Sequence, residues 1–345
     1  MILMAATPPD IWDWPVTQNY VRAVAEYLGI SLRTSWRVNG FFGELYRIGA
    51  SWPVRYDDPE TGAVLQCRLS KNQIRSAQLR EKILNDLEWD ELERIGQRLK
   101  FPAKSSNLDI RWCSSILKIT VADTVIRNLE ELKGYGQRMK FPAKGSCRQG
   151  RWCSGSLKAQ VEGTLYTEID EMSKDTKILV VSGERRQESS GRAKYNEMEL
   201  HRTNATAKAH RLVHQWRSVI DWDEAQIWDI IRRYRMTPHP CYAAGWNRCS
   251  CMMCIFSLPT HWAGIRELFP ERFAEMEEDE RLLGFTIDNK KSLAEYVGPA
   301  KSCVCHNDPK AIQQLITGDF SIKNVETPVW TMPAGAFHGA GGGPC

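Results

Sequence analysis

Hydrophobic and polar positions follow two different periods along this chain, and the alternation between them predicts an α/β fold. Ile2–Ala6 is a short apolar run that ends in a Thr-Pro-Pro turn, which predicts a strand. Thr17–Leu28 places apolar residues at helical spacing before Gly29, and Ser31–Trp36 again predicts a strand. This strand–helix–strand order is typical of a doubly wound, mostly parallel sheet.

Further elements follow from the same patterns. Asn72–Ile95 has an apolar stripe with charges on the other face, which predicts a helix. Ile178–Val181 is an unbroken apolar run, typical of a parallel strand buried on both faces. Leu212–Val219 predicts another strand, and the Asp-Trp-Asp-Glu stretch from Asp221 predicts the capped start of a helix. Ala263–Arg281 predicts an amphipathic helical region.

Cations cluster just after the apolar run that ends at Val181. Ser182-Gly183 allows a sharp turn, and Arg185, Arg186 and Arg192 follow. Open α/β sheets bind ligands outside the carboxyl ends of their strands, and guanidinium groups hold oxyanions in a bidentate grip. The pattern therefore predicts an anion site. The alternative is a solvated, salt-bridged helix start, because glutamates alternate with these arginines.

A repeated element precedes this strand. The stretch Gly96–Lys118 recurs as Gly136–Lys158, so that Cys113 corresponds to Cys153. Two copies are too few for a solenoid. Arginine and serine at the start of a helix can bind an anion. We favour the second copy as the anion-binding one because it leads directly into the strand. The alternative is that both copies are basic packing units with their tryptophans in the core.

A cysteine cluster provides the second chemical signal. The chain has 11 cysteines, an odd number that favours reduced thiols or metal ligands over disulfides. Four of them are the predicted metal ligands: Cys241, Cys249, Cys251 and Cys254. Their spacing suits a [4Fe–4S] cluster, with tetrahedral zinc as the alternative. Buried free cysteines are the remaining interpretation.

Composition sets the frame for these sites. With 345 residues, 42% hydrophobic and 26% charged, the chain is long enough for two domains. We predict an α/β domain over 1–235, with the duplicated element at 96–158, and a Cys-rich segment over 236–345. A net charge of +4 does not by itself indicate a nucleic-acid-binding protein. The sequence shows neither a bilayer-spanning apolar run nor a signal peptide, so we expect a cytoplasmic protein without membrane contact.

Several motifs resemble those of the phosphoadenosine phosphosulfate (PAPS) reductase family. The stretch V-S-G-E-R-R-Q-E-S-S-G-R-A is similar to its G-x-R-x-x-E-S-x-x-R motif, and R-W-C-S-x-x-L-K occurs at Arg111–Lys118 and Arg151–Lys158. Val213–Ile227 resembles the family's P-L-x-D-W-x-x-x-D-V-W region. The resemblance covers roughly Trp12 to Ile255. It implies a fold of the HUP, or adenine nucleotide α-hydrolase-like, class.

The resemblance also implies a substrate and a reaction. An adenine sulfonucleotide or ATP would be bound, with sulfur reduced or transferred at an iron–sulfur centre. The electron donor is not identified by the sequence. The substrate-binding residues carried over are Arg151, Cys153, Lys158, Ser182, Gly183, Arg185, Glu188 and Arg192.

Two departures from the family pattern favour a different class of function. The family's S-G-G-K-D-S-type phosphate loop has no match, and the phenylalanines of Gly40–Gly43 would block an anion from the backbone. Cys345 does not match the Glu-Cys-Gly-type tail of thioredoxin-linked members. The alternative is a non-catalytic subunit of a larger nucleoprotein, defence or mobile-element complex. A third possibility is nucleic-acid contact through the repeated lysines Lys100, Lys104, Lys140 and Lys144.

Overall fold

The computed structural model describes residues 2–6, 12–58, 61–86, 100–105, 107, 109–128, 177–205, 212–249, 251–288 and 290–337. The chain forms two compact units: Met1–Val125 together with Asp223–Cys345, and Ile126–Trp222. The predicted domain boundary at residue 235 stays a prediction. The two compact units have other boundaries, after Val125 and after Trp222. Among the described helices, none has the length and apolar character to cross a membrane.

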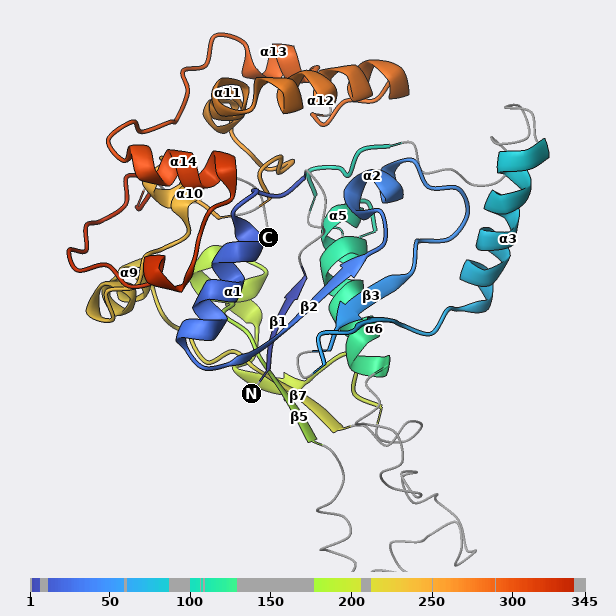
Figure 1. Cartoon of the computed structure of the whole chain (residues 1–345), viewed down its shortest axis with the longest axis horizontal. Helices are drawn as coiled ribbons and strands as arrows, with labels where there is room; N and C mark the ends of the chain where they lie inside the picture. The colour runs from blue at the N-terminus through green and yellow to red at the C-terminus, as the bar shows by residue number, and fades with distance from the viewer. Residues whose placement is uncertain are drawn as a thin grey trace, which may run out of the picture. The chain divides into compact units, whose positions relative to one another are not determined.

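A four-stranded mixed sheet lies in the first unit, with strand order β1-β2-β3-β4 (Figure 1). β1 (Ile2–Ala6) and β2 (Ser31–Arg37) are parallel and are connected by α1 (Thr17–Tyr27). This confirms the predicted strand–helix–strand unit. β3 (Val54–Asp57) and β4 (Val64–Gln66) continue the sheet in antiparallel pairing. One parallel pair does not make a doubly wound sheet, so that part of the fold stays a prediction.

The helices that follow the first strands position the site described below. They are α2 (Gly40–Leu45), α3 (Lys71–Asp86), α5 (Trp112–Ser114), a π-helical turn η2 (Ser115–Ile119) and α6 (Thr120–Asn128). The last three form one continuous segment. The Thr120 hydroxyl donates to the Ser115 carbonyl at 2.7 Å, across the wide π turn. α3 confirms the described part of the helix predicted over Asn72–Ile95.

The C-terminal part of the first unit is helical. Its elements are α9 (Glu224–Arg233), α10 (Pro240–Ala243), α11 (Pro259–Leu268), α12 (Pro270–Leu283), α13 (Leu293–Val297), α14 (Pro309–Thr317) and a 3-10 turn η7 (Ile322–Asn324). α11, α12 and α13 pack together, and α14 packs on α10 (Figure 1). The region predicted over Ala263–Arg281 is thus two helices, because Pro270 begins a new one.

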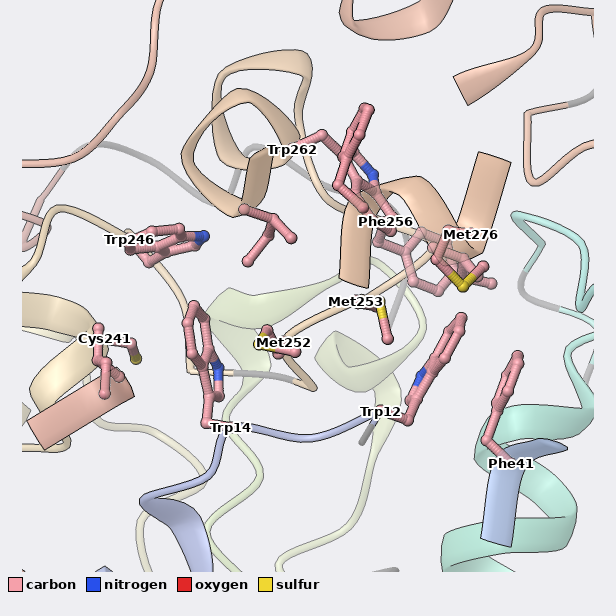
Figure 2. Packing of buried hydrophobic residues seen from close by; sticks show 14 of the residues in the cluster. Trp12, Trp14, Phe41, Cys241, Trp246, Met252, Met253, Phe256, Trp262 and Met276 are labelled. Atoms are coloured by element: carbon pink, nitrogen blue, oxygen red, sulfur yellow. The ribbon is translucent and has the colours of Figure 1, made fainter. Parts of the chain in front are cut away.

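The core of the first unit joins residues from both ends of the chain. Figure 2 shows Trp12 and Trp14 among side chains from the C-terminal half, including Trp246, Met252 and Met253. The Met253 backbone N–H donates to the Trp12 carbonyl at 3.3 Å. Five of these large side chains are at most 3% exposed. Packing of the first strand–helix unit therefore depends on the Cys-rich segment.

The second unit contains a three-stranded sheet of order β5-β7-β6. β5 (Lys177–Val181) runs parallel to the central strand β7 (Leu212–Trp216), and β6 (Met198–Leu200) runs antiparallel to it. Burial of β5 on both faces is a wrong prediction. β5 is an edge strand of this sheet, and Leu179 and Val181 are 50% and 52% exposed. The turns η5 (Arg186–Glu188) and η6 (Arg192–Lys194) follow β5.

A candidate metal and thiol site

The cysteine-rich loop is held by one tight backbone approach. Gly245 has φ +106°, and a Cβ built on it would lie 2.1 Å from the Cys303 carbonyl oxygen. The Cys305 N–H donates to the Ala244 carbonyl at 3.0 Å, which ties the two segments together. Only glycine allows this contact, since a side chain would push the segments apart. The cysteines before and after Gly245 are thereby brought to one place.

Three side chains of this loop form a group with metal-ligand geometry. The ligand atoms of His239, Cys241 and Cys249 all lie within 4.8 Å of one another. His239 and Cys241 are buried; Cys249 has an exposed surface, although its sulfur lies beside these two buried side chains. One nitrogen and two sulfurs at this spacing could hold a metal ion.

Hydrogen bonding within the group favours a thiolate. The Cys241 thiol donates to the Cys249 sulfur, which lowers the pKa of Cys249 well below its usual value despite burial; His239 and Lys118 act in the same direction. Burial raises the pKa of Cys241 itself. Cys249 is therefore the better anionic ligand of the pair.

A lysine, Lys118, lies at the other pair of cysteines. The Lys118 side chain forms a hydrogen bond with Cys251, and Cys251 and Asp13 raise the pKa of Lys118 against the effect of burial. Burial raises the pKa of Cys251 to about 12, although Lys118 opposes this shift. Burial also raises the pKa of Asp13. An ammonium group, a carboxyl group and thiols therefore interact at this place.

The lysine belongs to the first copy of the repeated element. Its Trp112 packs in the core, stacked on Phe41 with ring centroids 4.9 Å apart. Burial raises the pKa of Cys113 to about 11, and nearby Cys254 adds to the shift. The first copy therefore serves as a packing unit and also carries a cation to the cysteines. The favoured second copy, with Arg151, Cys153 and Lys158, lies outside the described residues.

The arginine motif of the second unit follows β5 as predicted, and its arginines are ion-paired. Arg185 Nε lies 3.4 Å from Glu188 Oε1, and Arg192 pairs with the other carboxylate oxygen of Glu188. Ser182 donates to Glu184 at 3.2 Å, and a Cβ on Gly183 would meet nothing within 4 Å. The salt-bridged arrangement left open in the sequence is therefore present. Anion binding by these arginines stays a prediction.

Residues 86–257 match the family model of the phosphoadenosine phosphosulfate reductase domain. The chain belongs to the PAPS reductase family. It is also 29% identical over 112 residues to the "Uncharacterized 37.8 kDa protein in gpa 5'region" of Escherichia phage 186. That alignment covers 32% of each protein, so the chain spans about a third of this curated relative. No solved structure matches the chain significantly.

The PAPS reductase segment contains both candidate sites. Lys118, the arginine motif and the four predicted cysteine ligands all lie within residues 86–257. The four-stranded sheet and the Cys303–Cys305 segment that packs on Gly245 lie outside it. Residues that precede and residues that follow the family segment in the sequence therefore pack against it.

The sequence-based prediction does not include two residues of the site. One is His239, which could have been found from its position two residues before Cys241 and between two prolines. Asp13 is the other, and nothing in its local sequence indicates a role. The structure brings His239 to Cys241 and Cys249, and it brings Lys118 and Asp13 to Cys251. Only long-range packing makes the second association.

Proposed function

We propose that this protein binds an adenine sulfonucleotide or adenylate and reduces or transfers sulfur at a metal centre in its Cys-rich loop. The observation that carries the proposal is the contact of Lys118 with Cys251. Lys118 belongs to a family-like R-W-C-S-x-x-L-K stretch, and Cys251 to the predicted metal loop. An ammonium group beside sulfur is suited to an anionic, sulfur-bearing substrate.

For the centre itself we propose a [4Fe–4S] cluster. The donor set fits, because thiols are the ligands that such clusters require and four lie within one loop. The proposed ligands are Cys241, Cys249, Cys251 and Cys254. When bound, the cluster would supply one-electron chemistry. Lys118 would hold the anionic end of the substrate.

A single zinc ion is the second candidate for this centre. The grouping of His239 with Cys241 and Cys249 favours it, since one nitrogen and two thiolates make three of four tetrahedral ligands. The two candidates require different residues. A cluster needs Cys254 and not His239, whereas the zinc site needs His239 and not Cys254.

For the substrate's phosphate groups we propose the arginine motif and the second repeat copy. Glu188 holds Arg185 and Arg192 together, so an oxyanion that replaced it would meet two guanidinium groups already side by side. Arg151, Cys153 and Lys158 complete the proposed set. We also propose that the chain has the doubly wound, mostly parallel sheet of the HUP class.

Metal analysis of protein purified without oxygen tests the centre. Iron with acid-labile sulfide, brown colour, and metal loss in Cys254→Ala but not in His239→Gln would support the cluster. Stoichiometric zinc, with the opposite response of the two variants, would support the zinc site. Cys67→Ala is the control, because Cys67 is buried outside the loop. Metal-free protein, or metal content unchanged in both variants, would contradict the proposal.

Calorimetric titration with adenosine phosphosulfates and ATP tests the substrate. We expect Arg185→Ala to weaken binding by about tenfold or more, because it removes a charged oxyanion contact. Arg186→Ala is the matched control, since Arg186 pairs with Asp221. Equal affinities of wild type and both variants would exclude the arginine motif as the site.

The alternative function is a non-catalytic subunit of a nucleoprotein, defence or mobile-element complex. The similarity to an uncharacterised phage protein favours it. This alternative predicts no sulfonucleotide binding, and saturable sulfonucleotide binding would contradict it. The third possibility, nucleic-acid contact through the repeated lysines, predicts binding that weakens steeply as salt rises. A flat salt response would exclude that contact.

A further inference from the structure

A polar cavity lies in the first unit, away from the cysteines of the loop. Its volume is about 300 Å³, and its lining includes Arg37, Arg68, Ser70 and Asn72. Hydroxyl and amide groups supply most of the remaining polar lining, and no carboxylate is among the described lining residues. A cavity with two guanidinium groups and no acid is suited to an anion.

Arg37 is the buried cation of this cavity. It ends β2 and is 3% exposed. Its Nε donates to the Ile116 carbonyl at 3.2 Å, and its Nη1 donates to the Trp52 carbonyl. Among the residues that the structure describes, none accepts a hydrogen bond from its Nη2. Arg37 is among the lining residues of the cavity, so we infer that this donor can serve a ligand there.

The charge around Arg37 is incompletely balanced. Among the described residues it forms an ion pair with Glu44, which is fully buried, with Oε1 3.9 Å from Arg37 Nε. Glu44 also pairs with Arg47 at 3.2 Å and interacts with Arg80. Three guanidinium groups therefore share one carboxylate. Burial lowers the pKa of Arg37 and Glu44 offsets this only in part, as expected of a cation that lacks a full partner.

The first turn of α3 supplies further donors. Ser70 and Gln73 cap this 16-residue helix reciprocally, with Ser70 N–H donating to Gln73 Oε1 at 2.9 Å. In the described structure the backbone N–H groups of Lys71 and Asn72 have no acceptor. A helix N-terminus carries partial positive charge, and Asn72 extends an amide to the cavity wall.

We propose that this cavity binds a tetrahedral oxyanion, sulfate or phosphate, held by Arg37 and the first turn of α3. The anion is either free in solution or the terminal group of an ester. The site requires neither the cysteine loop nor the arginine motif, so it stands independently of the proposed function.

Titration of the full chain with inorganic sulfate and phosphate at constant ionic strength tests this site. Asn72→Asp is the decisive variant: it places a carboxylate at the cavity and suits a helix N-terminus, so the fold is retained. We expect it to weaken binding by about tenfold or more. Gln78→Glu is the matched control, because it makes the same charge change on an exposed position of α3 that does not line the cavity. We expect its affinity to equal that of wild type.

A parallel titration with adenosine 5′-phosphosulfate and with AMP distinguishes the two sources of the anion. Saturable binding of the inorganic anions that is lost in Asn72→Asp supports a site for free oxyanion. Binding of the esters alone, again lost in Asn72→Asp, supports a site for the esterified group. The proposal is overturned if no anion binds saturably, or if Asn72→Asp and Gln78→Glu bind like wild type.

Discussion

Gly245 decides whether the cysteine-rich loop can pack on the Cys303–Cys305 segment. Its φ of +106° lies in a region that side chains rarely adopt, and the Cys303 carbonyl oxygen occupies the place of a Cβ. A side chain at this position would therefore meet both an unfavourable φ and a clash with Cys303, and a shift that relieves the clash leaves the φ unfavourable.

Gly245→Ala should therefore destabilise the protein by about 3 kcal/mol or more. Gly62→Ala is the matched control: Gly62 also has a positive φ of +70°, but nothing lies within 4 Å of its Cβ position. We expect it to cost only about 1 kcal/mol. Urea unfolding of both variants measures the difference. Equal losses would show that the contact with Cys303 is unimportant.

His261 is a second residue with a measurable consequence. It is 5% exposed, and its Nδ1 accepts a hydrogen bond from the Leu258 N–H at 3.4 Å. Burial, and then nearby Arg248, lowers its pKa from 6.5 to about 4. Between these values the unfolded chain binds the proton and the folded protein does not.

The free energy of unfolding should therefore fall as pH is lowered from 6.5 to about 4, by up to about 3 kcal/mol from this residue. Above pH 6.5 the residue contributes no pH dependence. Chemical unfolding across this range, compared between wild type and His261→Asn, isolates the contribution. A wild-type profile parallel to that of the variant would refute the assignment.

At the scale of residues, residue types and their local spacing predict the cysteines as metal ligands, but they do not predict which other side chains contact these cysteines. The four predicted cysteine ligands lie in one short stretch, and His239 lies in the same stretch. The sequence favours the second repeat copy over the copy that contains Lys118, because the second copy leads directly into the strand. Its contact with Cys251 depends on how distant segments pack.

Among the secondary-structure elements, α9 begins with a capping box, a signal that is local in sequence. Asp223 accepts from the Gln226 N–H at 2.8 Å, and the Gln226 side chain accepts from the Asp223 N–H at 2.9 Å. The sequence pattern predicts the capping box at Asp221 with Glu224, and the structure forms it two residues later, at Asp223 with Gln226. Both bonds lie within one turn, so tertiary packing is not needed to form them.

Asp223→Ala should destabilise the protein by about 1 kcal/mol, because it removes the cap from α9. Asp223→Ser should restore most of that loss. Asp229→Ala is the contrast, since Asp229 forms only exposed pairs with Arg232 and Arg233 on the same helix. We expect no measurable effect of that change. Thermal unfolding compares the three variants, and equal effects of Asp223→Ala and Asp229→Ala would contradict the capping argument.

Other elements show where local patterns are insufficient. Apolar composition predicted a β5 buried on both faces, but burial depends on which strands and helices cover it, and β5 has one neighbour in its sheet. The π turn at Ser115–Ile119 was not predicted. A π turn has no distinct apolar period of its own over five residues, so the sequence does not separate it from an α-helix.

At the scale of the whole molecule, the first unit is built from two distant segments. Trp12 and Trp14 pack against Trp246 and Met252, which lie more than two hundred residues later (Figure 2). Neither segment buries its aromatic side chains without the other. The second unit, Ile126–Trp222, is inserted between them in sequence.

A chain truncated after Trp222 should therefore fail to form the first unit, because Trp12, Trp14 and Phe41 would be exposed to water. We expect loss of near-ultraviolet circular dichroism and increased binding of a hydrophobic dye. Co-expression with residues 223–345 should restore both signals to the native level. A truncated chain that unfolds cooperatively with native-like tryptophan signals would contradict this description.

The amino-acid sequence by itself determined the α/β class, the short strands and capped helices, the family and the cysteine-rich loop, because each depends on residues close together in the chain. Only the tertiary structure decided that Lys118 and Asp13 reach Cys251, that Gly245 packs against Cys303, and that Arg37 lines a cavity whose described lining residues include no acid. These contacts join residues that are far apart in sequence. The local hydrophobic period and residue spacing do not predict which distant side chains pack together.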